Sequence, residues 1–267
     1  MESIYKRLLL ATVFLFLISH SLFAAEITAS ALPAAAAAPF EKAQELEKDG
    51  KLIEARKIYE ELLLDRELDQ KSARQIRKSY EDLNVKLLFS KAEMPGTILH
   101  EVKPGESLSL LAQKYKTTVD LIKKSNGLTK DVIQAGKKLK VVNGTFLIKI
   151  DKSRNLMLVF LDGKWFKHYR IATGSHGGTP AGEFKIINKI KDPTWYKIGK
   201  VIPGKSPKNA LGSRWLGFDN PGYGIHGTTS PSSIGQHTTS GCIRMLNEEV
   251  EELYLMVPIG TQVKVAD

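Results

Sequence analysis

The sequence predicts a multidomain chain in which a helical segment and a small βααβ module precede a mainly β domain. Three observations lead to this prediction. Apolar residues recur every three or four positions within residues 40–93, as they do on one face of a helix. A compact strand–helix–helix–strand pattern follows over residues 97–142. Short alternating runs, broken by Gly and Pro, fill residues 145–266 and indicate a closed or sandwiched β-fold.

The composition limits the classes of protein to consider. The chain has 267 residues, a net charge of +10 and one cysteine. A hydrophobic fraction of 42% and a charged fraction of 25% are typical of globular proteins and exclude a wholly disordered chain. One cysteine excludes an internal disulfide framework and a Cys-rich zinc module. The positive charge favours an anionic partner, which composition alone leaves open among nucleic acid, a membrane surface and a carboxylate-rich polymer.

The N-terminal segment predicts export. Lys6 and Arg7 precede the short apolar run 8–18, and small residues follow at Ala24 and Ala25. This order is typical of a secretory signal peptide over residues 1–25, with a retained membrane anchor as the alternative. Residues 26–39 are rich in Ala and Pro and predict a linker. An exported basic protein rarely meets nucleic acid, so we expect no nucleic-acid partner and a location in the periplasm or cell wall.

Residues 40–93 predict helices. Two apolar stripes mark them, and Gly50 lies where one helix ends and the next begins; the stripes comprise Leu52, Ala55, Ile58, Tyr59, Leu62 and Leu63, and then Ala73, Ile76, Tyr80, Leu83 and Leu87. The segment from Gly50 resembles the helical hairpin of a tetratricopeptide repeat, but about one and a half units are too few to stack. A groove for a protein partner and a plain helical spacer therefore both stay open.

Residues 97–142 predict a self-contained βααβ module. Thr118 is expected to cap its second helix, and Asn126-Gly127 to end it. Four short motifs resemble those of a LysM domain: Pro104-Gly105-Glu106-Ser107-Leu108, Leu111-Ala112 with Tyr115, Asn126-Gly127-Leu128, and Gly136 with Leu139. The resemblance implies binding to glycan that contains N-acetylglucosamine, chiefly peptidoglycan.

The C-terminal segment shows strand patterns and one helix. Asp162-Gly163 separates two β-rich runs and predicts a hairpin. Only residues 247–256 show a helical pattern, with Asn247 as the expected cap and Glu248 and Glu249 in the first turn.

Cys242 is the candidate nucleophile of this domain. A lone free cysteine often packs as a small apolar residue, but Cys242 follows Gly241 in a polar stretch. A lone cysteine with a histidine elsewhere in the chain is a candidate catalytic pair, and His226 and His237 precede it by sixteen and five positions. These three residues could also be combined into a zinc site, although their spacing fits no closed zinc pattern, and we expect neither metal nor cofactor.

Motifs around Cys242 resemble those of the YkuD-type L,D-transpeptidases. They are Ile225-His226-Gly227-Thr228, Ser240-Gly241-Cys242-Ile243-Arg244, and upstream Thr179-Pro180-Ala181-Gly182-Glu183-Phe184. The resemblance spans nearly all of residues 145–265 and implies a β-sandwich. One departure is Ser240, where many members carry histidine, which puts a role for a second histidine in doubt.

The resemblance also implies roles for the site residues. Cys242 would attack a tetrapeptide stem of peptidoglycan as a thiolate, with its pKa lowered by a neighbouring imidazolium of His226. The Gly227 carbonyl would orient His226, and backbone N–H groups around Ser240, Gly241 and Cys242 would hold the oxyanion.

Three further side chains are candidates for substrate contact. Arg244 would either brace the loop or meet a stem carboxylate, and Tyr223 and Trp195 are expected to be cleft walls, with ordinary packing as the alternative. The expected product is a 3→3 cross-link, and the family implies sensitivity to carbapenems. An L,D-carboxypeptidase or cross-link hydrolase that uses the same cysteine, and a non-catalytic peptidoglycan-binding protein, remain as alternatives.

Overall fold

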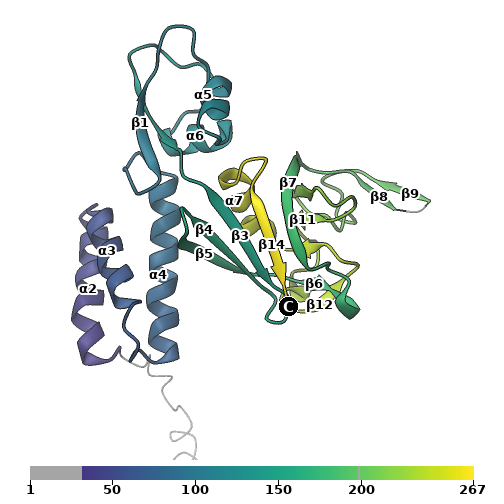
Figure 1. Cartoon of the computed structure of the whole chain (residues 1–267), viewed down its shortest axis with the longest axis horizontal. Coiled ribbons are helices and arrows are strands. Elements are labelled where there is room, and N and C mark those ends of the chain that lie inside the picture. The colour runs from purple at the N-terminus through teal and green to yellow at the C-terminus, as the bar shows by residue number, and fades with distance from the viewer. Residues whose placement is uncertain (1–31, 198) are drawn as a thin grey trace, which may run out of the picture.

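A computed structural model describes residues 32–197 and 199–267. The expected signal peptide lies outside these residues. Within the described residues, three helices come first, the βααβ module follows, and the β-rich domain comes last (Figure 1). Among the described residues, no helix is both long and apolar enough to cross a membrane.

The N-terminal part forms three helices, α2 (Ala34–Lys48), α3 (Leu52–Leu62) and α4 (Gln70–Leu88). Helix α2 begins inside the stretch that was expected to be a linker, so that prediction is wrong for residues 34–39. The physical reason is composition: alanine has the highest helix propensity, and Pro39 lies only in the second turn. The Asp69 side chain caps α4 by accepting the N–H groups of Lys71 and Ser72.

The three helices share one hydrophobic core with the β-rich domain. Helix α4 lies along β5 (Lys164–Arg170), the last strand of the main sheet, as Figure 1 shows. Asn84 Nδ2 donates to the Phe166 carbonyl (2.9 Å), and buried Glu81 accepts hydrogen bonds from the His168 backbone and ring. The helices therefore cover the free edge of this strand, which protects it from pairing with other chains. Their likeness to a tetratricopeptide repeat stays a prediction.

The βααβ module has the expected element order. Its elements are β1 (Thr97–Glu101), α5 (Leu108–Lys114), α6 (Val119–Asn126) and β2 (Lys138–Val142). The Thr118 hydroxyl caps α6, and Gly127 ends this helix in the left-handed conformation. Both local predictions are confirmed, and the module has a small hydrophobic core of its own.

Buried polar contacts fasten this module to both neighbours. Lys140 Nζ donates to the carbonyls of Leu87 and Ser90 at the C-terminal end of α4. A lysine at this position also complements the negative end of the helix dipole. On the other side, the Thr118 hydroxyl donates to the Leu255 carbonyl (3.0 Å). The βααβ module is thus packed against both of its neighbours in the chain.

The β-rich domain is built on one mixed sheet of eight strands, in the order β13-β11-β10-β7-β14-β3-β4-β5. The strands not yet given bounds are β3 (Phe146–Asp151), β4 (Leu156–Leu161), β6 (Thr173–Gly174), β7 (Gly182–Lys191), β8 (Trp195–Lys197), β9 (Lys200–Ile202), β10 (Arg214–Phe218), β11 (Gly224–His226), β12 (His237–Thr239), β13 (Ile243–Arg244) and β14 (Gln262–Ala266). The Asp162-Gly163 hairpin between β4 and β5 is confirmed.

The sheet is a single curled layer where a sandwich of two sheets was expected (Figure 1). The reason is the length of β7, which pairs with β14 over residues 182–185 and with β10 over residues 186–191. One strand thereby joins the two halves of the sheet. Helix α7 (Asn247–Met256) has the bounds that the sequence pattern predicts, and it packs against β10 and β11.

Candidate active site

His226 ends strand β11, and Cys242 directly precedes β13, the parallel strand beside it. Strands β11 and β13 pair in register, with Ile225 opposite Ile243 and His226 opposite Arg244. Partner residues in a sheet share a face, and side chains two positions apart return to that face. His226 and Arg244 therefore share a face, while Cys242 lies in the bend directly before β13, and the charge of Arg244 acts on both His226 and Cys242. Both candidate residues therefore lie within the electrostatic reach of Arg244, and their catalytic pairing stays a prediction.

His226 is held as a neutral imidazole with one free nitrogen. Its Nδ1–H donates to the Gly227 carbonyl at 2.7 Å, which leaves Nε2 without a proton. The ring is 4% exposed and stacks on Trp215, with centroids 6.1 Å apart. Burial is the main cause that lowers the pKa of His226 to about 4; the Gly227 hydrogen bond opposes this shift and the positive charge of Arg244 assists it. An imidazole of this kind is a proton acceptor at neutral pH.

The Cys242 thiol is half-buried, and its Sγ lies 3.3 Å from the Gly222 carbonyl. Burial raises the pKa of this thiol, although the Gly224 backbone N–H and the charge of Arg244 act in the opposite direction. The expectation that an imidazolium lowers the pKa of Cys242 is therefore wrong, because His226 is neutral at pH 7 and burial raises the pKa of the thiol. Both groups are shielded from water, and burial favours the uncharged form of each.

Two buried threonines hold the chain on either side of Cys242. The Thr239 hydroxyl accepts the Gly241 N–H at 3.1 Å and donates to the Cys242 carbonyl at 2.6 Å. The Thr179 hydroxyl accepts the Gly174 N–H at 2.7 Å and donates to the Gly241 carbonyl at 2.9 Å. The Gly241 N–H is thus engaged within the loop, which corrects its predicted place among the oxyanion donors; the N–H groups of Ser240 and Cys242 remain as candidates.

Tyr223 lies against this loop, as the sequence suggested. Gly241 has a φ of 135°, and a Cβ there would come within 2.6 Å of the Gly178 carbonyl and 2.7 Å of the Tyr223 ring. Only glycine fits at this position. Trp195 has a different setting, because it lies on β8 in a two-stranded hairpin with β9 that projects from the domain (Figure 1).

Arg244 lies beside both candidate catalytic side chains. Its charge lowers the pKa of both His226 and Cys242. One guanidinium nitrogen, Nη1, donates to the Ser233 hydroxyl at 2.9 Å, while Nε is buried without a partner among the described residues. Arg244 therefore has one anchored nitrogen and one buried donor that is left unpaired.

His237 is engaged away from His226. Its Nδ1–H donates to Thr173 Oγ1 (2.8 Å), and its Nε2 accepts from Asn155 Nδ2 (3.2 Å). Both ring nitrogens are therefore occupied. In the part of the chain that the structure describes, no group of three or more His, Cys, Asp or Glu side chains could hold a metal ion.

Sequence reasoning missed two residues that support His226. Trp215 lies opposite His226 in the antiparallel pair of β10 and β11, a register that the sequence does not reveal. Asn247 was expected to cap α7, but Leu246 occupies the cap position and Asn247 is the first helical residue. Its side chain instead binds the loop after His226. The only available signal was that Asn247 stands five residues after Cys242.

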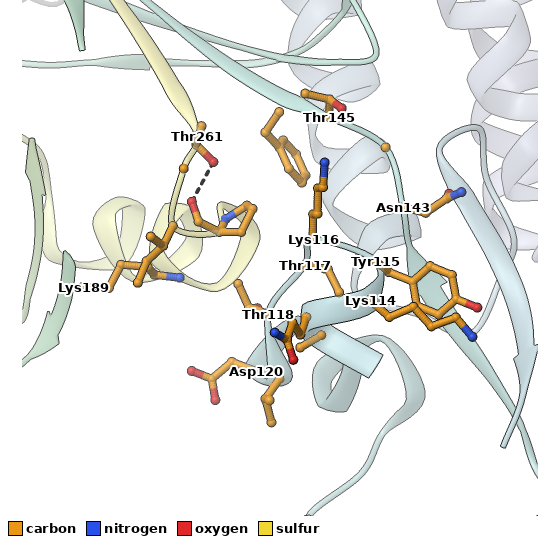
Figure 2. A pocket seen from close by; sticks show the side chains of 18 of the residues that line it. Lys114, Tyr115, Lys116, Thr117, Thr118, Asp120, Asn143, Thr145, Lys189 and Thr261 are labelled. Carbon is orange, nitrogen blue, oxygen red and sulfur yellow. Dashed lines mark hydrogen bonds between the residues drawn. The ribbon is translucent and has the colours of Figure 1, made fainter. Parts of the chain in front are cut away.

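A hollow of about 1160 Å³ lies between the βααβ module and the β-rich domain (Figure 2). One wall is the turn between α5 and α6, and the other includes Lys189, Thr145 and Thr261. Figure 2 shows Lys116 extending into this interdomain cleft. Asp120 is the one carboxylate of the lining and pairs with Lys191 at 3.0 Å. The lining thus carries three lysines, Lys114, Lys116 and Lys189, against this one carboxylate, and the cleft is positively charged.

Comparisons with known proteins agree with this architecture. Residues 145–265 match the L,D-transpeptidase catalytic domain called YkuD, and residues 100–142 match the LysM domain. The chain is 44% identical to YqjB of Bacillus subtilis over 124 residues, which are 44% of this chain and 69% of that protein. It is 32% identical to YkuD of Bacillus licheniformis over 177 residues, which are 63% of this chain and 98% of that protein. Both relatives carry the name of an L,D-transpeptidase.

Among solved structures, the chain is similar to the catalytic domain of the L,D-transpeptidase of E. faecium. The identity is 28%, the match covers 45% of this chain and 96% of that one, and the TM-score is 0.38. The family assignment follows from the sequence relatives: this chain belongs to the YkuD family of L,D-transpeptidases. A LysM domain precedes its catalytic domain.

Proposed function

We propose that this protein is an exported L,D-transpeptidase that forms 3→3 cross-links in peptidoglycan through a thioester on Cys242. The observation that carries the proposal is the unprotonated Nε2 of His226 at the end of β11, beside the strand that Cys242 directly precedes. A neutral thiol beside a neutral, oriented imidazole is the arrangement needed for base-assisted attack on an acyl group.

The first step transfers the acyl group to the enzyme. Nε2 of His226 takes the Cys242 proton while the sulfur attacks the carbonyl between the diamino acid and the terminal D-alanine of a tetrapeptide stem. The carbon–sulfur bond forms, the carbon–nitrogen bond breaks, and the proton passes from His226 to the departing amine of D-alanine. Backbone N–H donors of Ser240 and Cys242 would stabilise the oxyanion, at roughly 3–4 kcal/mol of barrier per donor.

The second step transfers the acyl group to an acceptor. The side-chain amine of a second stem attacks the thioester and gives its proton to Nε2 of His226. The carbon–sulfur bond breaks, the new amide completes the cross-link, and the sulfur recovers the proton. Arg244, which has an unpaired buried Nε, is a candidate to meet a stem carboxylate, and Tyr223 and Trp195 are candidates for substrate contact.

The LysM domain is proposed to hold glycan while the catalytic domain acts on the attached stems. The positive interdomain cleft supports this part of the proposal, since wall stems carry carboxylates. An exported enzyme is consistent with such a substrate, which lies outside the cytoplasm.

The experiment is incubation of the protein with tetrapeptide-bearing wall fragments, followed by mass spectrometry. Cross-linked dimers with loss of D-alanine would support transpeptidation. Free tripeptides without dimers would instead identify a carboxypeptidase, because the thioester would then pass to water. A Cys242→Ala variant should lose both activities, and a carbapenem should add one covalent adduct to the natural protein only. Stem processing by Cys242→Ala would contradict the assignment of the nucleophile.

A further inference from the structure

The side chain of Asn247 binds two loops of the catalytic domain at once. Its Oδ1 accepts the N–H of Ser213 (3.2 Å) and the N–H of Thr228 (3.1 Å), and its Nδ2 donates to the Thr228 carbonyl (2.8 Å). Ser213 directly precedes β10, and Thr228 lies two residues after His226. One amide at the start of α7 therefore fixes the chain just beyond the candidate base.

Two glycines make room for this amide. A Cβ at Gly212 or at Gly227 would overlap Oδ1 of Asn247. Gly212 also has a φ of 62°, in the region that favours glycine. Gly212, Gly227 and Asn247 thus form a closely packed group, called the seat below. The backbone at the two glycines approaches the Asn247 amide more closely than a side chain would permit.

The seat lies next to the contact that fixes the tautomer of His226. The Gly227 carbonyl accepts the Nδ1–H of His226 at 2.7 Å, and the following residue, Thr228, is bound by Asn247 at both its N–H and its carbonyl. The peptide that carries the Gly227 carbonyl ends at the Thr228 nitrogen. The N–H of this same peptide donates to Asn247, so the amide sets the direction in which the Gly227 carbonyl points.

We propose that Asn247 is a positioning residue for the proposed reaction: it aims the Gly227 carbonyl at Nδ1 and so keeps Nε2 of His226 unprotonated toward Cys242. This inference rests on the proposed function for its catalytic consequence. The alternative is that Asn247 only anchors α7 to the sheet. Its loss would then lower the free energy of unfolding and leave the tautomer of His226 unchanged.

The experiment compares Asn247→Ala and Asn247→Asp with a matched control, Asn126→Ala. Asn126 is also a buried amide with three hydrogen bonds to backbone groups, but it lies in the LysM domain. The Asp variant keeps an oxygen for the N–H groups of Ser213 and Thr228, but it replaces the donor with a second carboxylate oxygen that repels the Thr228 carbonyl and so displaces the loop that Asn247 holds. The Asp variant also provides the test of the inference if Asn247→Ala fails to fold.

The first readout is NMR of the imidazole nitrogens of His226, which does not depend on activity. We expect a single Nδ1–H tautomer in the natural protein and in Asn126→Ala, and a mixture of tautomers in the Asn247 variants. An unchanged Nδ1–H tautomer in both Asn247 variants would overturn the inference, whatever their stability.

The second readout is the rate at which a carbapenem acylates Cys242 as a function of pH. A misdirected base should slow acylation about ten- to a hundredfold at neutral pH in Asn247→Ala. The deficit should shrink at alkaline pH, where the thiol ionises without help from His226. A deficit that is the same at every pH would contradict a positioning role.

The two readouts separate this inference from the proposed function. If the natural protein holds the single tautomer but is never acylated and processes no stems, the proposed function fails and the tautomer comparison still decides the role of Asn247. If Cys242 is acylated normally in every variant, Asn247 does not position the base, and the proposed function stands.

Discussion

The hydroxyl of Thr179 donates a hydrogen bond to the carbonyl of Gly241, directly before Cys242, across 2.9 Å. These residues are far apart in the sequence, and the contact joins the segment that leads into β7 to the loop that presents the thiol. Thr179 also accepts the Gly174 N–H, so one hydroxyl satisfies two backbone groups beside the candidate nucleophile.

Replacement of Thr179 by valine should disturb this loop. The variant keeps the shape of the side chain but leaves the Gly174 N–H and the Gly241 carbonyl unpaired, at a cost of about 1–3 kcal/mol each. We expect the free energy of unfolding to fall by about 2 kcal/mol and carbapenem acylation to slow about tenfold. Intact-mass kinetics and urea unfolding measure the two effects.

Thr261→Val is the matched control for this change. The Thr261 hydroxyl is buried and donates to the Pro258 carbonyl at 2.7 Å, away from the Cys242 loop. The Thr261→Val variant should have a lower free energy of unfolding but an unchanged rate of carbapenem acylation. Equal acylation by the natural protein and Thr179→Val would show that the Thr179–Gly241 contact does not position the nucleophile.

The buried imidazole of His226 should make stability depend on pH. The folded protein holds its pKa near 4, below the ordinary value of 6.5, so between these values the unfolded chain binds a proton that the folded protein does not. Stability therefore falls as pH drops through this window, by about 2 kcal/mol between pH 7.5 and pH 5. Urea unfolding at both pH values should show a smaller decrease for His226→Gln, and an identical decrease would refute the burial effect.

The interdomain cleft should contribute to wall binding through charge. Lys116→Glu reverses an exposed charge within the cleft, and we expect about three- to tenfold weaker co-sedimentation with purified peptidoglycan at low salt. The difference should vanish near 1 M salt, where the screening length is about 3 Å. Lys71→Glu, an exposed change on α4, is the control, and a similar loss in that variant would argue against a role for the cleft.

Glu81 should be the most sensitive contact between the helices and the sheet. It is 4% exposed and accepts from the His168 backbone (3.1 Å) and ring (2.7 Å). Removing it in Glu81→Ala leaves these two part-buried donors without their acceptor, and we expect about 2–3 kcal/mol of lost stability. Because β5 is an edge strand, light scattering should also detect association. Asp82→Ala, which changes the exposed neighbouring carboxylate, should cost much less; equal effects would contradict this explanation.

Local signals in the sequence predicted local structure well. The Thr118 cap, the Gly127 helix end and the Asp162-Gly163 turn depend on the conformations of adjacent residues, and all three are present. The pairing of Cys242 with His226 stays a prediction: the motif has His226 at the end of β11 and Cys242 directly before the neighbouring β13.

Contacts between distant segments could not be predicted from the sequence. Nothing adjacent to Asn247 shows that its amide fits against Gly212 and Gly227, and its place near a helix start favoured the wrong role of a cap. The pKa directions at the site were missed for the same reason, since they depend on burial by residues from several strands. The long β7 pairs on both sides of its length, and only the folded sheet reveals this.

Lys140 has a consequence for how such an enzyme would work on a wall. Its ammonium group is buried against carbonyls of α4, and burial lowers its pKa to about 8. This contact and the Thr118–Leu255 hydrogen bond hold the LysM domain against the rest of the chain. The domain therefore does not move independently, as a domain on a flexible linker would. A glycan strand bound to the LysM domain would lie at a fixed distance from Cys242 Sγ. The protein would then select stem peptides by their spacing along the polymer.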